Sequence, residues 1–255
     1  MTASWSRLVF MAALLLVAAC RPMIRQDARI VFSDAPPAVE ALISAINRQN
    51  DAVSPFKGIG QISIRDSSAV QTSRAAWAGS PDGRLRIEFL GLPGQPAAKL
   101  IFDGRLLYVE SVTEPESYRK SVADPDLKPI TGVSIKAGEV ITCLAGGIPI
   151  YEHDAVFLEP ASEENRQALV FNQSWRGVVE KIFFNGLVIE KVEIWEWGTL
   201  VYQAALKDIR EVNGRLIPFH LVITDADNRG FEFRIDRCWT DIGVSPEIFK
   251  IPLGD

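Results

Sequence analysis

Residues that could perform acid–base, nucleophilic or metal chemistry are few in this chain. The two histidines, His153 and His220, lie far apart in sequence, and His220 falls on the polar face of a predicted strand, where we expect a surface histidine. The sequence contains no His-Glu-x-x-His, Gly-x-Ser-x-Gly or paired-cysteine motif. Asp225 and Asp227 lack a glutamate at the spacing of a calcium loop, and they predict a hairpin turn instead. We therefore predict a protein that is not an enzyme and that uses neither a cofactor nor a metal.

Cys20 is the cysteine whose surroundings indicate covalent chemistry. It follows the small residues Ala18 and Ala19, and an apolar run over residues 8–17 precedes them after Arg7. That run is far shorter than the roughly 20 residues of a membrane-spanning helix and has the form of a signal peptide. Because a cysteine stands where the bacterial lipoprotein signal places it, residues 1–19 resemble a type II signal peptide, with cleavage before Cys20 and lipid on its thiol. The alternative is an ordinary signal peptide followed by a chance cysteine.

The remaining composition restricts the partners of the chain. Lys and Arg number 27 against 32 Asp and Glu, a formal net charge of −5, and removal of Arg7 with residues 1–19 makes it one unit more negative. A nucleic-acid partner would require a basic stripe, so we exclude one. Cys143 and Cys238 either form a disulfide in an oxidising compartment or are two small buried hydrophobic residues, and their wide spacing favours the second.

The positions of the apolar residues predict short strands and two helices. Helical spacing occurs over residues 38–47, after two prolines, and over residues 135–144, before Gly146-Gly147. Residues 111–129 form a charged excursion with at most one short strand. Alternation of apolar and polar residues, with Asp-Gly and Asn-Gly turns, predicts strands over residues 56–64, 73–79, 85–89, 99–102, 106–109, 155–158, 168–171, 178–184, 187–195, 200–209, 216–223 and 231–239.

These elements predict a mainly β domain with two or three helices. We expect an open, half-closed antiparallel β-barrel of about ten or eleven strands with a helical lid, over residues 35–255, after a flexible tether at residues 20–34. Two short helices cannot cover all of the apolar face of such a sheet tightly, so we predict a concave, apolar, partly open interior. The candidate wall residues of this cavity are Ile62, Trp77, Leu85, Ile87, Phe89, Ile141, Phe219, Leu221, Phe231 and Phe233. Each could equally be part of a filled core.

Four stretches between residues 56 and 252 resemble the LolA/LolB superfamily of lipoprotein carriers and receptors. The first is Phe56-Lys57-Gly58-Ile59-Gly60-Gln61-Ile62-Ser63-Ile64, followed by Trp77 in the aromatic position of the second strand. Residues 85–94 are similar to the receptor's strand and Pro-Leu-Gly loop, although this loop reads Gly91-Leu92-Pro93-Gly94. The others are Gly147-Ile148-Pro149 after a helix, within residues 139–149, and the ending Phe249-Lys250-Ile251-Pro252. The C-terminal half is longer than the receptor's, which indicates a divergent branch.

The resemblance implies a LolB-like function. Such a protein accepts a lipoprotein from a soluble periplasmic carrier, shelters its acyl chains in the apolar cavity, and releases it into the outer membrane, on whose periplasmic face its own lipid anchor holds it. By the same resemblance, Leu92 is the loop leucine that enters the membrane; the alternative is a leucine folded back on the domain. Two other functions stay open: a non-enzymatic lipid- or protein-binding sensor or scaffold of the cell envelope, and an enzyme with a dispersed site, which the missing motifs disfavour.

Overall fold

The computed structural model describes residues 37–66, 69–91, 96–112, 117–160 and 166–252; Cys20, Leu92 and residues 1–34 lie outside this part. Within it thirteen strands form a single antiparallel sheet, accompanied by helices α2 (Pro37–Asp51), α3 (Lys128–Thr131) and α4 (Ala137–Leu144) and two 3₁₀ turns, η2 (Ser174–Arg176) and η3 (Pro246–Phe249). The strands are β1 (Phe56–Arg65), β2 (Val70–Ser80), β3 (Arg84–Leu90), β4 (Pro96–Phe102), β5 (Leu106–Ser111), β6 (Tyr118–Ser121), β7 (Ala155–Pro160), β8 (Arg166–Gln173), β9 (Val178–Asn185), β10 (Val188–Glu196), β11 (Thr199–Val212), β12 (Arg215–Thr224) and β13 (Gly230–Thr240).

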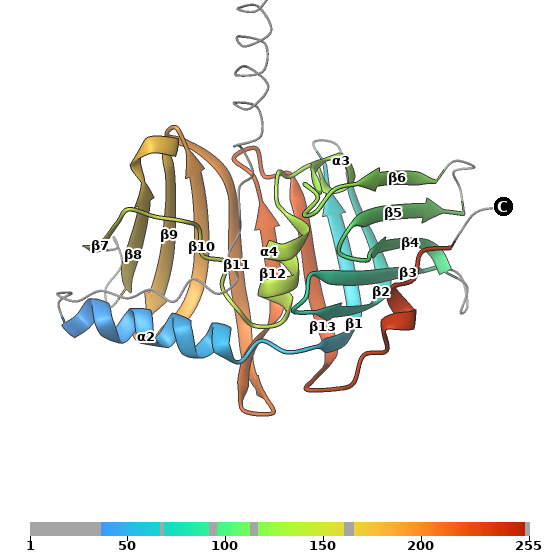
Figure 1. Ribbon diagram of the computed structural model, residues 1–255, viewed down its shortest axis with the longest axis horizontal. Coiled ribbons are helices and arrows are strands. Elements are labelled where there is room, and N and C mark those ends of the chain that lie inside the picture. Colours follow the sequence, from blue (N-terminus) through green and yellow to red (C-terminus); the bar gives the residue numbers. More distant parts are fainter. Residues whose placement is uncertain (1–36, 67–68, 92–95, 113–116, 161–165, 253–255) are drawn as a thin grey trace, which may run out of the picture.

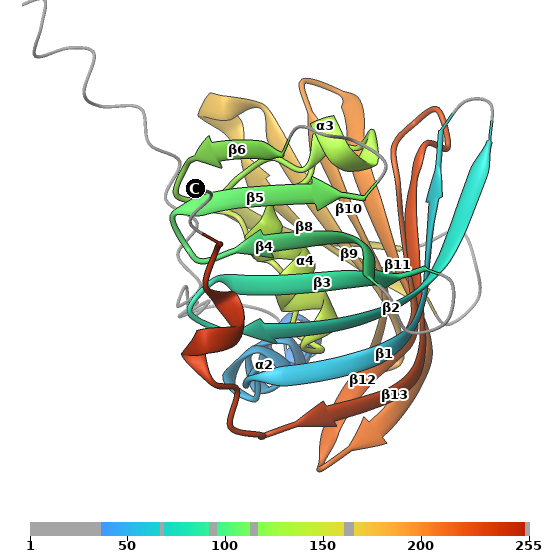
Figure 2. The ribbon, with the colours of Figure 1, turned by 90° about the vertical axis from the view of Figure 1, so that its right-hand side faces the viewer.

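The predicted fold class is confirmed: the sheet is antiparallel, strongly curved and not closed into a barrel, and helices lie inside the curve (Figures 1 and 2). The expected number of ten or eleven strands is too low. Each predicted segment forms a separate strand, and the charged excursion adds β6, whose four residues are all exposed and carry no apolar alternation. Among the described helices, none combines the length and apolar character that a membrane-spanning helix needs.

The sheet consists of two meanders that meet in its middle. Its strand order is β6-β5-β4-β3-β2-β1-β13-β12-β11-β10-β9-β8-β7, so the chain begins in the centre, runs to one edge, and later returns from the other edge. Several described turns are tight; at the β11–β12 turn Asn213 and Gly214 have φ angles of 51° and 77°, the left-handed pair that a two-residue Asn-Gly turn requires. Strands β6 and β7 are the two edges, and the connection between them has to cross the open sheet.

Helix α4 lies on that connection and covers the concave face. It packs against β12 and β3, and Figure 1 shows it over the middle of the sheet. Its residues Val140, Ile141 and Leu144 are at most 1% exposed and belong to the same hydrophobic core as the sheet. The amphipathic helix α2 adds Leu42, Ile43 and Ile46 to this core, so the helices act as a lid over the apolar face, as predicted.

The close packing of β1 on β2 depends on a missing side chain. Gly58 is paired with Trp77 across the two strands, and a Cβ at Gly58 would lie 2.4 Å from the indole ring. The indole occupies the space beside Gly58 and reaches Phe233 on β13, with the ring centroids 5.2 Å apart. The Gly58 of the sequence pattern thus makes space for the largest aromatic side chain of the predicted wall.

We predict that Gly58→Ala lowers the free energy of unfolding by about 1–3 kcal/mol, because the added methyl group has to displace a packed indole ring. Gly243→Ala is the matched control, since a Cβ there meets nothing within 4 Å. Chemical denaturation of both variants measures the difference. Equal stabilities would show that the β1–β2 packing does not depend on this glycine.

Candidate functional site

The predicted cavity wall lies on the concave face and is covered. Nine of the ten candidate residues are buried, Phe219 being the most exposed at 8%, and Phe89 is partly buried against the same core. The structure therefore differs from the partly open interior expected above, because α4 and the neighbouring side chains cover the apolar face. The sheet brings most of the candidates together: Phe233 is paired with Ile62 on one side and with Leu221 on the other.

An aromatic cluster forms the centre of this wall. Trp77 contacts Phe233 edge to face, and Phe233 contacts Phe231 in the same manner at 6.0 Å between ring centroids. The indole Nε1 of Trp77 is buried and has no hydrogen-bond partner within the described part of the chain. The concave face near β1, β2 and β13 is thus almost entirely apolar, with one unsatisfied N–H donor among aromatic rings.

A buried carboxyl group attaches the lid to the sheet. Glu139 lies in the first turn of α4 and is 2% exposed. Its Oε2 accepts a hydrogen bond of 2.7 Å from the backbone N–H of Lys136, which closes a capping box at the start of the helix. Its Oε1 accepts hydrogen bonds from the hydroxyl groups of Tyr151, in the segment after α4, and of Tyr202 on β11, the latter at 3.0 Å.

A second buried carboxyl group belongs to the same cluster. Glu180 on β9 is completely buried, and its Oε2 accepts a hydrogen bond of 3.0 Å from the backbone N–H of Tyr151. Its Oε1 has no hydrogen-bond partner among the described residues. Tyr151 therefore connects the two acids, through its hydroxyl group to Glu139 and through its backbone to Glu180.

The electrostatics of this acid cluster favour its neutral form. Burial raises the pKa of the Glu139 carboxyl to about 7, although its three hydrogen bonds act in the opposite direction. Burial also raises the pKa of Glu180 well above its usual range, and the charge of Glu139 adds to the effect. The hydroxyl pKa values of Tyr151 and Tyr202 are raised as well, mainly by burial. Burial therefore disfavours the ionised form of all four groups, and Glu139 titrates near neutral pH.

The sequence analysis missed both acids, although one of them left a signal. Along β9, Val178, Ile182 and Phe184 occupy the buried face in strict alternation, and Glu180 stands among them on the same face. A charged residue at an apolar position of a strand is rarely buried without a partner. Glu139 gave a weaker signal, because an acidic residue in the first turn of a helix is common for reasons of capping alone.

The other residues considered above have structural roles. Asp225 accepts hydrogen bonds from the backbone N–H groups of Asp227 and Arg229, so the predicted hairpin turn is confirmed. His220 is not the surface residue that was expected: it is partly buried, with its Nε2 3.2 Å from a carboxylate oxygen of Glu232. Both Cys143 and Cys238 are free thiols, and burial raises the pKa of each. Within the described residues, no group of three or more metal-liganding side chains is close enough to hold an ion.

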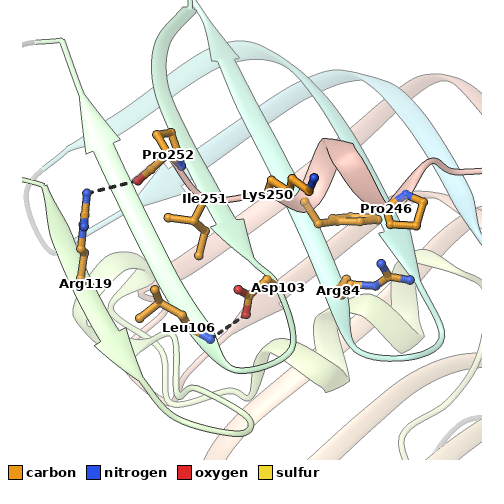
Figure 3. A pocket seen from close by; sticks show the side chains of 9 residues that line it. Arg84, Asp103, Leu106, Arg119, Pro246, Lys250, Ile251 and Pro252 are labelled. Carbon is orange, nitrogen blue, oxygen red and sulfur yellow. Dashed lines mark hydrogen bonds between the residues drawn. The ribbon is translucent and has the colours of Figure 1, made fainter. Parts of the chain in front are cut away.

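A pocket of about 420 Å³ lies on the opposite, convex face of the sheet, where the C-terminal segment crosses β3 to β6 (Figure 3). Arg84 lies over the ring of Phe249 at 5.0 Å, and Arg119 donates a hydrogen bond of 3.4 Å to the backbone oxygen of Pro252. The Phe249 to Pro252 ending thus fixes the end of the chain to the outside of the sheet. None of the predicted acyl-cavity residues lines this pocket, so it is separate from the apolar wall.

Comparison with solved structures supports the fold assignment. The chain is similar to a LolA superfamily protein from Nitrosomonas europaea (TM-score 0.56, 12% identity, 82% of this chain and 96% of that one). It is also similar to a putative outer membrane lipoprotein-sorting protein domain from Vibrio parahaemolyticus (TM-score 0.54, 9% identity, 83% of this chain and 95% of that one). A third similar structure is a DUF1329 family protein from Desulfovibrio piger (TM-score 0.57, 14% identity, 84% of this chain and 95% of that one). No known family model and no curated protein matches the sequence. The fold is therefore LolA/LolB-like, at a sequence identity too low to carry a function with it.

We predict that Tyr202→Phe lowers the free energy of unfolding by about 1–3 kcal/mol, because the buried Glu139 loses a hydrogen-bond donor. The loss is larger at pH 8 than at pH 6, since Glu139, with a pKa of about 7, is mostly ionised at the higher pH and then depends more on its donors. Chemical denaturation of the variant and the wild type at pH 6 and pH 8 measures this difference in stability. Tyr118→Phe is the control, because Tyr118 is 40% exposed, and equal effects of the two substitutions would contradict the prediction.

Proposed function

We propose that this protein is a membrane-anchored lipoprotein that binds the acyl chains of other lipoproteins and helps to insert them into the outer membrane. The single observation that carries the proposal is the apolar concave face of an open LolA-like sheet, over whose centre lies a helix of only eight residues. A small lid over a large apolar face can be displaced by a ligand of the same character. No bond is made or broken in such a transfer.

The contacts of α4 indicate what an acyl chain would replace. Val140, Ile141 and Leu144 face the sheet with hydrocarbon side chains, and a fatty chain can make the same non-directional contacts. Each Å² of chain removed from water contributes about 25 cal/mol, so a chain that buries a few hundred Å² gains several kcal/mol. In the structure described here the wall is covered, and an acyl chain reaches Trp77 and Phe233 after α4 moves.

The anchor in this proposal is lipid on Cys20, after removal of residues 1–19. A single acyl chain binds a membrane only marginally, at about 0.8 kcal/mol for each buried CH₂ group, whereas several chains together hold a protein firmly. Residues 20–34 then form a tether that lets the domain reach both a soluble periplasmic carrier and the periplasmic surface of the outer membrane. The partners in this scheme are lipid acyl chains, the outer-membrane leaflet and that carrier.

We predict that the non-lipidated domain, from Arg21 onward, carries fatty acyl ligands when it is purified from a bacterial envelope fraction. Native mass spectrometry measures the additional mass, and organic extraction identifies the ligand. Leu221→Asp, which places a carboxylate on the apolar face of the sheet itself, is expected to reduce the bound fraction. A domain that is free of acyl ligands and that takes none up from lipid vesicles would remove the carrier proposal.

Leu92 is proposed to contact the membrane during delivery, from the loop between β3 and β4. We predict that Leu92→Glu leaves the fold and stability unchanged but abolishes lipoprotein delivery, because a carboxylate is costly to place among acyl chains. Delivery is measured as the share of lipoproteins in the outer membrane of cells depleted of the native protein. Leu187→Glu, at an exposed leucine of the β9–β10 hairpin, is the matched control; normal delivery by the Leu92 variant would end this assignment.

A further inference from the structure

Hydrogen bonds join α4 and the segment after it to strands β9 and β11 in a buried cluster. A further backbone bond joins Asp154, in the same segment, to Asn172 on β8. Glu139 on α4 accepts from Tyr202 on β11, and Tyr151, shortly after α4, donates its backbone N–H to Glu180 on β9. The hydroxyl group of Tyr151 completes the connection by donating to Glu139. The other contacts of α4 with the sheet that the described residues show are made by apolar side chains, which give no directional attachment. The state of these two acids therefore bears directly on how firmly the lid is held.

We propose that Glu139 and Glu180 form a proton-operated latch, which holds α4 against the sheet while both acids are protonated and loosens it when they ionise. This inference rests on the proposed function, because the latch would regulate access to the apolar face that binds acyl chains in that proposal. The ligand that the two carboxyl groups bind in this proposal is a proton. Closure of the lid takes up protons, and opening releases them.

The surroundings of the two acids do not support two negative charges. A buried carboxylate without a compensating cation is strongly disfavoured, and a second one nearby raises the cost further. Among the described residues no ion pair is made by either acid, and the unpartnered Oε1 of Glu180 is the atom on which a proton can be held without disturbing an existing bond. The titratable groups that face the pair are Asp124, before α4; Cys143 on α4; Tyr151; and Tyr202 on β11.

The direction of the pH response follows from the raised pKa values. With the lid open, Glu139 meets water and has its ordinary pKa of 4.5, whereas in the closed form its pKa is about 7. The closed form therefore binds the proton more tightly. The contribution of Glu139 to closure is complete below pH 4.5, decreases as pH rises, and is lost above about pH 7. Between these two values the closing equilibrium constant falls by up to roughly tenfold per pH unit. Glu180 acts in the same direction.

Opening by this latch would uncover the predicted acyl site. Ile141 lies two residues after Glu139 on α4 and is 1% exposed in the core that contains Trp77, Phe233 and Leu221. When the first turn of α4 is released, these side chains lose their cover. Deprotonation of the latch thus favours loading of the apolar face, and protonation favours its closure after the cargo has left.

The test is hydrogen exchange of the full chain in nanodiscs between pH 5 and 8, corrected for the intrinsic exchange rate at each pH. Protection of the α4 amides is expected to fall by up to about tenfold per pH unit relative to the amides of β1 and β13 as Glu139 ionises. In parallel, a photoactivatable fatty acid is crosslinked at pH 5.5 and pH 8, and its attachment to peptides of β2 and β13 is expected to rise at pH 8.

Glu139→Gln is expected to abolish most of the pH dependence, and Glu180→Gln to reduce it, while Glu152→Gln, an exposed acid in the segment after α4, leaves it intact. If either the Glu139 or the Glu180 variant does not fold, the other variant and the wild-type pH profile still test the proposal. Equal pH dependence of α4 and the sheet, or full pH dependence in both buried-site variants, overturns the latch. A lid that loosens with pH although no fatty acid labels β2 or β13 supports the latch and counts against the proposed carrier function instead.

Discussion

The structure depends on one constraint: the thirteen-stranded sheet does not close, so its apolar concave face has no partner layer of its own. An apolar face has to be removed from water, and here α2 and the connection from β6 to β7 provide that cover. Helix α4 therefore lies on the path that the chain must take between the two meanders. Because both ends of this path are fixed in the sheet, α4 can lift without leaving the molecule.

A few buried hydrogen bonds hold this cover in position. The side chain of Asn50, at the end of α2, both donates to and accepts from the backbone of Ile148, with bonds of 3.0 and 2.7 Å, so α2 is joined to the segment that follows α4. Gly147 leaves room for this contact, because a Cβ there would lie 2.7 Å from Val53. Apolar side chains cover the sheet, and a few hydrogen bonds fix the position of the helices and of the segment after α4 on it.

The open LolA/LolB-like architecture was implied by the resemblance, and helical spacing predicted both main helices. Alternation of apolar residues predicted the strands that have one buried face, but not β6, whose four residues are all exposed. It could not predict that β1 and β13 would meet in the centre, since pairing of distant strands leaves no local pattern. It also suggested a half-empty interior, because the number of apolar side chains does not reveal how closely α4 fills the curve. Glu139 and Glu180 escaped because burial of a charge is decided by tertiary neighbours that the sequence does not display.

An unclosed sheet has a further consequence, which lies in its two outermost strands. Each edge offers unpaired backbone groups to any other strand, and such edges invite association between copies of a chain. Here β6 is only four residues long and contains Arg119 and Lys120, and β7 ends at Pro160, which has no N–H to offer. Short length, positive charge and proline leave a poor template for a neighbouring copy. The sheet can thus stay unclosed while both of its edges discourage pairing with a strand of another molecule.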